Sequence, residues 1–415
     1  MAPTASNALP APVAVPVSPR RGHKLWSAAM AALVLGACGD SDSADAALNP
    51  IDAAALRGTV ETLARDMLVP GAVVLLKTPR GDFSTTYGVS AYKGSTPTAY
   101  DQHVRVGSNT KSWVGTVILQ QVQEGLLALH DPVSKYRPGV PNGAAITIEQ
   151  LLNMRSGLFN YTTTDEFNRR LDEEPLKVWT PEELLAMGFA RAPESDPGER
   201  FDYSNTNTVL LGLIAQQVEH GKPLQDILRD RLFVPLGLSH TFLPAASSNL
   251  LPEPRSRGYM YGNNVLTNGK ALPAPMQAEA RAGTIDPVDY TDANPSWGWA
   301  AGAGISTATE LLRWVQAMVG GNLLNADLQA RRLASVQTIE PGNPASAGYG
   351  WALAKFGPLY GHTGELPGYN SFMGHDPVNR VTLVVWTNLA PAPDGRDPAT
   401  AIADALIGKI YAAPK

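Results

Sequence analysis

A serine and a lysine three residues apart form the first pair in this sequence with the chemistry of a catalytic site. Ser108 and Lys111 open a stretch in which apolar residues recur at helical spacing from Val114 to Val122. Residues three apart on a helix share a face, so the lysine amine can reach the serine hydroxyl. A lysine removes the hydroxyl proton only when burial lowers its own pKa, and the apolar run that follows predicts such burial.

The Ser-x-x-Lys spacing alone does not settle which residues react. A second copy, Ser90 and Lys93, lies between Gly88 and Gly94 in a predicted loop, where nothing forces the two side chains onto one face. An ordinary helix start is the alternative interpretation of Ser108 and Lys111 at this point.

Two more motifs contain groups suited to proton transfer and substrate binding. Tyr203 and Asn205 precede a predicted helix at 206–220, and a second Tyr-x-Asn copy at 261–263 lies in a Gly/Asn-rich stretch. The tripeptide 362–364, His-Thr-Gly, lies on a predicted strand, where its glycine lets a substrate approach the backbone. Each motif alone would be interpreted as loop or core.

The elements that must position these motifs form a sheet built from both ends of the chain. We predict strands at 70–77, 82–89, 349–355, 359–363, 371–375 and 381–388, with helices at 51–66, 307–319 and 398–411. Short turns between the later strands indicate antiparallel pairing. Residues 51–126 and 291–415 are expected to form a sheet lobe, and 127–290 a mainly helical lobe inserted between them. Residues 245–295, which begin in the insertion and end just after it, are expected to be a long surface excursion. We expect the site in the cleft between the lobes.

Composition narrows the function classes. The chain has 415 residues, 44% hydrophobic and 17% charged, with a net charge of -5, which indicates a globular protein without the basic footprint of nucleic-acid binding. Its seven histidines include no His-Glu-x-x-His spacing, which argues against a zinc hydrolase. We expect neither a metal nor a cofactor.

The first fifty residues have the layout of an export signal. Residues 1–19 are an atypical extension, after which Arg20, Arg21 and Lys24 precede an apolar run at 26–37. This run ends at Cys38, the only cysteine, in a sequence that resembles the lipobox of bacterial lipoproteins. We therefore expect a signal peptide at 1–37, a lipidated Cys38 with a flexible tether at 38–50, and attachment to the bacterial cell envelope through lipid alone. A plain signal peptide with an incidental cysteine is the alternative.

Together, the three motifs in this order resemble the active-site elements of the penicillin-recognising serine hydrolases, which include class C β-lactamases, DD-peptidases and family VIII carboxylesterases. The resemblance extends over nearly all of 51–415 and is strongest to secreted serine D-alanyl-D-alanine carboxypeptidases, which often carry His-Thr-Gly. It implies an α/β, β-lactamase/transpeptidase-like fold, with an antiparallel sheet flanked by helices and an inserted helical region.

The resemblance also implies roles. Ser108 would form an acyl-enzyme, Lys111 and Tyr203 would move the proton, and no metal or cofactor would take part. The expected substrate-binding residues are Asn205, His362, Thr363, Gly364 and Glu365. Of these, residues 362–364 would line the wall opposite the nucleophile. The backbone N–H groups of Ser108 and Glu365 would hold the oxyanion.

The sequence departs from these carboxypeptidases where they hold the substrate's terminal carboxylate. Glu365 follows the His-Thr-Gly motif where they tend to have threonine, and Ala354 with Lys355 occupies the place expected for an arginine. We therefore expect neutral esters or amides to be better substrates than peptides that end in a free carboxylate.

Other functions remain open at this stage. The resemblance predicts a D-alanyl-D-alanine carboxypeptidase-like enzyme that acts on a small peptide, amide or ester, and an esterase or β-lactamase of the same superfamily is the alternative. A non-catalytic lipoprotein that binds cell-wall peptides would need the cleft but not the proton-transfer residues. An α/β-hydrolase is disfavoured because the nearest Gly-x-Ser-x-Gly candidate, Gly304 to Ala308, lacks the final glycine. We expect a monomer.

Overall fold

The computed structural model describes residues 48–321, 323–340, 342–343 and 346–412. The expectations for the signal peptide, Cys38 and most of the tether fall on residues outside these ranges. In the described ranges, every helix is too short or too polar to cross a bilayer.

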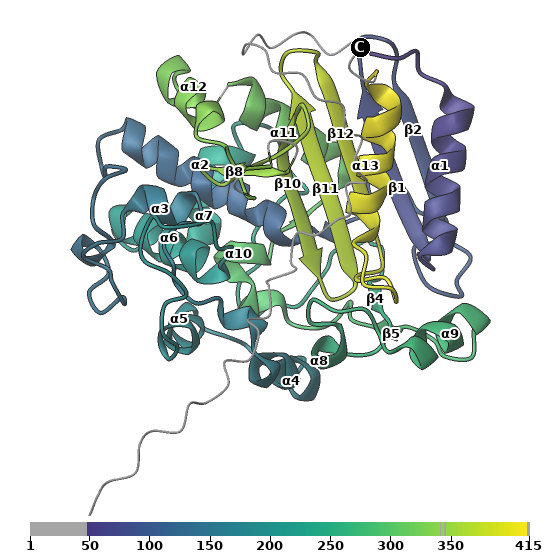
Figure 1. The fold of residues 1–415 in the computed structure, drawn as a ribbon, viewed down its shortest axis with the longest axis horizontal. Helices are drawn as coiled ribbons and strands as arrows, with labels where there is room; N and C mark the ends of the chain where they lie inside the picture. The colour runs from purple at the N-terminus through teal and green to yellow at the C-terminus, as the bar shows by residue number, and fades with distance from the viewer. Residues whose placement is uncertain (1–47, 322, 341, 344–345, 413–415) are drawn as a thin grey trace, which may run out of the picture.

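One antiparallel sheet of eight strands forms the centre of the fold, in the order β2-β1-β12-β11-β10-β9-β8-β7 (Figure 1). The strands span β1 Gly71–Lys77, β2 Phe83–Gly88, β7 Gln337–Thr338, β8 Gly348–Gly350, β9 Leu353–Phe356, β10 Leu359–Leu366, β11 Tyr369–Asp376 and β12 Val381–Thr387. The N-terminal hairpin joins the C-terminal strands where β1 pairs with β12, with Val74 opposite Val385. The predicted sheet from both ends of the chain is thus confirmed.

The structure differs from the predicted strand at 349–355. That stretch is divided between β8 and β9, which pair with each other so that Gly350 lies opposite Leu353. The chain reverses at Ala352, whose φ of 49° is outside the range of a strand. A reversal made by non-glycine residues gave no turn signal in the sequence.

Helices cover both faces of the sheet (Figure 1). The helices α1, Ala53–Asp66, and α13, Pro398–Ile410, pack on one face, and α11, Ala308–Gly320, packs on the other. The remaining helices are α2 Thr110–Gln123, α3 Ile148–Leu152, α4 Asp165–Glu173, α5 Pro181–Phe189, α6 Asn205–Val218, α7 Leu224–Leu228, α8 Asn264–Thr267, α9 Ala274–Ala282, α10 Trp299–Gly302 and α12 Ala326–Ala334.

The expected surface excursion is partly internal. It contains α8, α9 and the short strands β4, Tyr259–Met260, and β5, Val288–Asp289. Tyr259 and Met260 are buried, and β4 pairs with β5. This stretch therefore adds apolar contacts to the core in addition to crossing the surface.

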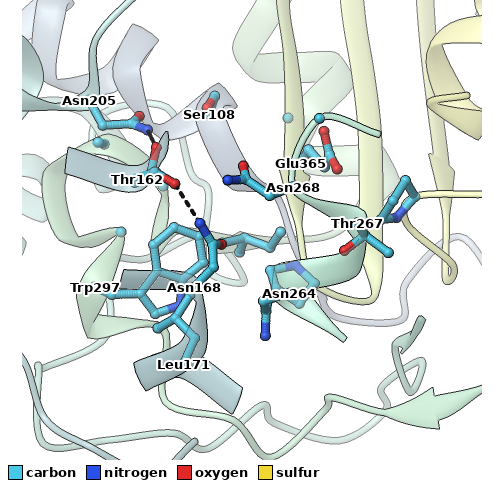
Figure 2. Close-up of a pocket in the computed structure, with 18 of the residues that line it drawn as sticks. Ser108, Thr162, Asn168, Leu171, Asn205, Asn264, Thr267, Asn268, Trp297 and Glu365 are labelled. Carbon is cyan, nitrogen blue, oxygen red and sulfur yellow. Dashed lines mark hydrogen bonds between the residues drawn. The ribbon is translucent and has the colours of Figure 1, made fainter. Parts of the chain in front are cut away.

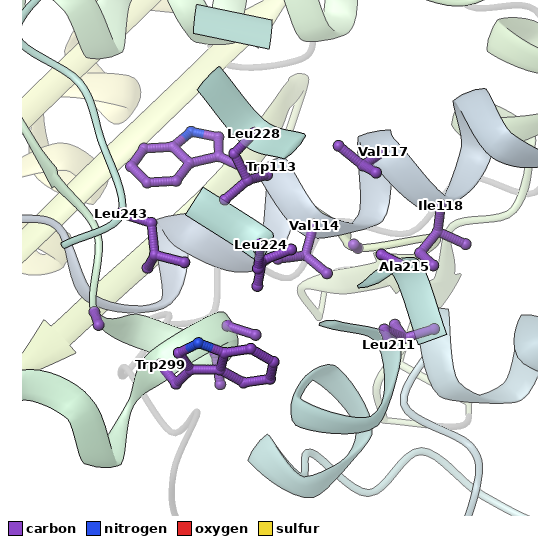
Figure 3. Packing of buried hydrophobic residues seen from close by; sticks show 14 of the residues in the cluster. Trp113, Val114, Val117, Ile118, Leu211, Ala215, Leu224, Leu228, Leu243 and Trp299 are labelled. Carbon is purple, nitrogen blue, oxygen red and sulfur yellow. The ribbon is translucent and has the colours of Figure 1, made fainter. Parts of the chain in front are cut away.

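Helix α2 is enclosed on nearly every side. Its residues from Thr110 to Leu119 are all buried, and its apolar side chains pack against residues of α6, α7 and α10 (Figure 3). Polar groups on such a helix must find partners inside the protein. Lys111 belongs to this buried set, with no accessible surface.

Two glycines within helices test how closely α2 is packed. A Cβ at Gly115 of α2 would lie 2.2 Å from the Cβ of Ala352, whereas a Cβ at Gly58 of α1 would meet nothing within 4 Å. Gly115→Ala should lower the free energy of unfolding by about 1–3 kcal/mol through overpacking. Gly58→Ala should raise it by up to about 1 kcal/mol through helix propensity. Urea unfolding of both variants measures the difference, and equal shifts would contradict this packing.

His362 on β10 is fully buried in the sheet lobe. Its Nδ1 lies 2.6 Å from the carbonyl oxygen of Thr363, and its Nε2 lies 3.1 Å from the hydroxyl of Tyr349. Since a carbonyl only accepts, Nδ1 carries the proton and Nε2 accepts from Tyr349. Burial, with a smaller contribution from the charge of Lys111, lowers the pKa of His362 to about 3.

This pKa predicts a pH dependence of stability. An unfolded histidine binds its proton near pH 6.5 while the folded one does so only near pH 3, so protons favour the unfolded chain between these values. The contribution of His362 to the unfolding free energy should fall by about 1.4 kcal/mol per pH unit as the pH drops through this window. Urea unfolding at several pH values should show a shallower loss in His362→Asn than in wild type. Parallel curves would contradict a buried neutral His362.

Candidate active site

Ser108 lies in a short 3-10 turn, Gly107–Asn109, that leads directly into α2. The end of β10 packs tightly against this turn: a Cβ at Gly107 would lie 2.4 Å from the backbone nitrogen of Glu365. Gly107 also has a φ of 54°, which a glycine adopts without strain. The missing side chain thus lets the sheet lobe contact the backbone beside the serine.

Lys111 projects from the first turn of α2 toward Ser108. Its Nζ lies 2.9 Å from Ser108 Oγ, 2.6 Å from Asn205 Oδ1 and 2.6 Å from the carbonyl oxygen of Ala301. These three partners are uncharged, and burial lowers the pKa of Lys111 well below the usual lysine value. The predicted contact between the two side chains is therefore present, in the buried setting that the apolar helix indicated.

Asn205 opens α6 and is held by the loop before α4. Its Nδ2 donates to Thr162 Oγ1 at 3.1 Å, and its backbone N–H donates to Asn160 Oδ1 at 3.2 Å. The donation to Thr162 fixes the amide orientation (Figure 2). It thereby directs Oδ1 toward Lys111. Asn205 thus connects the lysine to the pocket wall.

Tyr203 joins the same group. The face of its ring lies 4.9 Å from Lys111 Nζ, and its hydroxyl makes a side-chain hydrogen bond with Ser108. Burial raises the pKa of Tyr203, and the bond to Ser108 only partly offsets this effect. The phenol accordingly keeps its proton at neutral pH.

The β10 residues divide between the pocket and the interior. Thr363, Gly364 and Glu365 line the pocket, as the sequence suggested, but His362 is not among the lining residues. Successive strand side chains point to opposite faces, so Thr363 and Glu365 face the pocket while His362 is buried behind it. The expectation that His362 lines the wall is thus corrected. Its side chain lies on the opposite face of β10 and contacts Tyr349 instead of the pocket.

The second copies of the motifs lie elsewhere. Ser90 Oγ bonds the carbonyl oxygen of Thr96, while Lys93 forms an exposed ion pair with Asp286. In the other Tyr-x-Asn copy, Asn263 caps α8 through Leu266, and Tyr261 is buried in the sheet-lobe core. Neither copy contacts Ser108 or Lys111.

A pocket of about 180 Å³ opens beside Ser108 between the helical and sheet sides (Figure 2). This volume holds on the order of ten water molecules, which suits a small substrate. Its apolar part includes Phe167, Leu171, Met260 and Trp297. Two acidic residues, Glu365 and Asp397, line it, whereas no lysine or arginine of the described chain does. Within that same part of the chain, no cluster of metal-binding side chains is found.

Four of the residues that build the site were not predicted. Thr162, Asn160 and the carbonyl of Ala301 orient Asn205 and Lys111, and Asp397 lines the pocket. Only Asp397 had a local signal, because an acid before Pro398 is a typical helix start. The others act through contacts with residues distant in sequence.

The comparisons with known proteins agree with this geometry. Residues 45–407 match the family model described as Beta-lactamase. A D-stereospecific amidohydrolase from Streptomyces sp. superposes with a TM-score of 0.72 at 29% identity, over 86% of this chain and 98% of that one. A D-amino acid amidase from Ochrobactrum anthropi SV3 gives a TM-score of 0.68 at 26% identity, over 85% and 99%.

Curated relatives include penicillin-binding proteins. Penicillin-binding protein 4* of Bacillus subtilis is 25% identical over 80% of this chain and 71% of its own length. The putative penicillin-binding protein PbpX of the same organism is 25% identical over 68% of this chain, and the match spans only 61% of its length. The chain belongs to the Beta-lactamase family, within the serine hydrolase superfamily of penicillin-binding proteins and D-amino acid amidases.

Proposed function

We propose that this protein hydrolyses small amides or esters through an acyl-enzyme on Ser108, and that it prefers them to peptides ending in a free carboxylate. The observation that carries this proposal is the buried Lys111 amine, placed 2.9 Å from Ser108 Oγ among uncharged partners.

The hydrogen bonds of Lys111 suit a neutral amine that acts as a base. A neutral amine has two N–H donors and one lone pair. The Ala301 carbonyl and Asn205 Oδ1 only accept, so they take the two donors and leave the lone pair for the Ser108 hydroxyl. With its pKa lowered by burial, Lys111 is ready to take the serine proton as Ser108 attacks a carbonyl carbon.

Tyr203 is suited to pass that proton to the leaving group. Its phenol stays protonated because burial raises its pKa, and it bonds directly to Ser108. It donates its proton to the departing nitrogen or oxygen and regains one from Lys111. Water then attacks the carbonyl of the acyl-enzyme and gives a proton to the same groups. They return a proton to Ser108 Oγ as its bond to the acyl group breaks, and the carboxylic acid product is released.

The developing oxyanion needs donors on the side of the pocket where β10 meets the serine turn. The backbone of Glu365 packs against Gly107, so its N–H and that of Ser108 are the donors we assign. Losing one such donor typically costs a hundredfold to a thousandfold in kcat.

The charges of the pocket support the preference against carboxylates. Glu365 and Asp397 line it, and Lys355, the residue expected to compensate, instead places its Nζ 5.0 Å from the ring of Tyr360 and does not line the pocket. A negative charge about 4 Å from a substrate carboxylate costs roughly 4 kcal/mol at an effective dielectric constant near 20. Likeness to a D-stereospecific amidohydrolase and a D-amino acid amidase agrees with an amide substrate.

A D-alanyl-D-alanine carboxypeptidase-like activity is the second candidate. Similarity to penicillin-binding protein 4* favours it, as does the His-Thr-Gly motif.

We also propose that the protein acts at the cell envelope, held by a lipid on Cys38. The first 38 residues have the layout of an export signal that ends in a lipobox-like sequence.

The substrate preference is tested by comparing kcat/KM for a nitrophenyl ester, an amino-acid amide and diacetyl-Lys-D-Ala-D-Ala. Wild type should favour the ester and amide, and Glu365→Thr should shift the preference toward the peptide, because it replaces an acid beside the serine turn with a hydroxyl that can donate to the substrate's carboxylate. Ser108→Ala should abolish all three activities, and Tyr203→Phe should lower kcat by roughly 10² to 10⁴. Strong peptidase activity that Glu365→Thr leaves unchanged would contradict the preference.

A further inference from the structure

Two carboxyl groups face each other on the sheet side of the pocket. Glu365 lies near the end of β10, and Asp397 lies just before α13. Both line the pocket that contains Ser108, and their side chains are hydrogen-bonded to each other. The same pocket presents no basic side chain from the described residues, so nothing there neutralises the pair.

Asp397 occupies the N-cap position of α13 without serving as its cap. The backbone N–H groups of Ala399 and Thr400 donate instead to Asn370 Oδ1, at 2.7 and 3.2 Å. The Nδ2 of Asn370 donates to the carbonyl of Gly364 at 3.1 Å, which ties the start of the helix to β10. Because Asn370 takes over the capping, the carboxyl of Asp397 is left to face Glu365 and the pocket.

The pair shares a proton. Desolvation of its carboxyl, followed by the charge and hydrogen bond of Asp397, raises the pKa of Glu365 well above its ordinary value, although the residue as a whole is exposed. Burial also raises the pKa of Asp397, and the bond from Glu365 opposes this. Two adjacent carboxyls seldom ionise together, so Glu365 holds the proton and Asp397 accepts it. The empty pair thus carries about one negative charge.

Other ionisable groups near the pair are already engaged. Arg396, next to Asp397, directs its guanidinium to Asp66 and Asp394. On β10, His362 is neutral and buried behind the pocket. Across the pocket, Tyr203 and Lys111 belong to the Ser108 group. A cationic ligand group would therefore meet the pair without a competing protein cation.

We propose that Glu365 and Asp397 bind the ammonium group of the substrate, so that the preferred substrates are amides or esters of amino acids or peptides with a free α-amino group. This inference rests on the proposed function, because it places the scissile carbonyl at Ser108. The α-ammonium group is one carbon from that carbonyl. The backbone of Glu365 packs against Gly107, in the turn that contains the nucleophile. The Glu365 side chain therefore lies within reach of the α-ammonium group.

Binding can be measured without turnover in the Ser108→Ala protein. Calorimetry with D-alaninamide and with N-acetyl-D-alaninamide compares a ligand that has the ammonium with one that lacks it. The charged ligand should bind more tightly, and Glu365→Gln or Asp397→Asn should reduce this preference by roughly ten- to hundredfold, the range for a charge-assisted hydrogen bond. Below about pH 8, where the ligand's own ammonium group keeps its proton, affinity for D-alaninamide should rise with pH as the shared proton leaves, whereas affinity for the acetylated ligand should not.

A matched control comes from the same helix. Asp404 lies on α13 outside the pocket, and Asp404→Asn should leave the preference for the charged ligand unchanged. Equal binding of both ligands, or a preference that survives both pocket substitutions, would overturn the inference. Turnover assays separate the two claims: pair-dependent binding in a wild-type protein that cleaves neither amides nor esters would support the ammonium site and contradict the proposed function.

Discussion

The burial of the Lys111 amine without a charged partner is the constraint on which the rest of the site depends. An unfolded lysine holds its proton up to about pH 10.4, so keeping the folded amine neutral costs about 1.4 kcal/mol of stability for each pH unit below that value, until the folded amine itself takes up a proton. The packing of α2 within the helical region must offset that cost. The same packing fixes Asn205 and Ala301, which come from distant parts of the chain, as partners of the amine.

The two sides of the pocket contribute different chemistry. The helical side supplies Ser108, Lys111, Tyr203 and Asn205, and burial there lowers the pKa of the lysine and raises that of the tyrosine. The sheet side supplies backbone from β10 and the acidic pair at 365 and 397. Gly107 lets these sides meet, since any side chain there would collide with the β10 backbone. Reaction and substrate selection are thus assigned to separate elements joined at one close backbone contact.

Much of this arrangement was predictable because it depends on local periodicity. The spacing of Ser108 and Lys111 fixes their contact within one helical turn, and the short turns between the later strands predict the antiparallel sheet. Contacts between distant segments were not predictable: nothing near Thr162 indicates that it orients Asn205. The role of His362 depends on which face of β10 its side chain occupies. The role of Asp397 depends on Asn370, which caps α13 in its place. Neither feature can be predicted from the neighbouring residues in the sequence.

The most direct test of this account is to locate the covalent acyl group after incubation with a penicillin. Intact-protein mass spectrometry measures the adduct, and peptide mapping identifies the residue that carries it. The account predicts one adduct per chain on the peptide that contains Ser108, formed far more slowly in Lys111→Ala and absent in Ser108→Ala. An adduct on Ser90 or any other residue, or acylation unchanged by the loss of Lys111, would contradict the claim that these two side chains form the reactive pair.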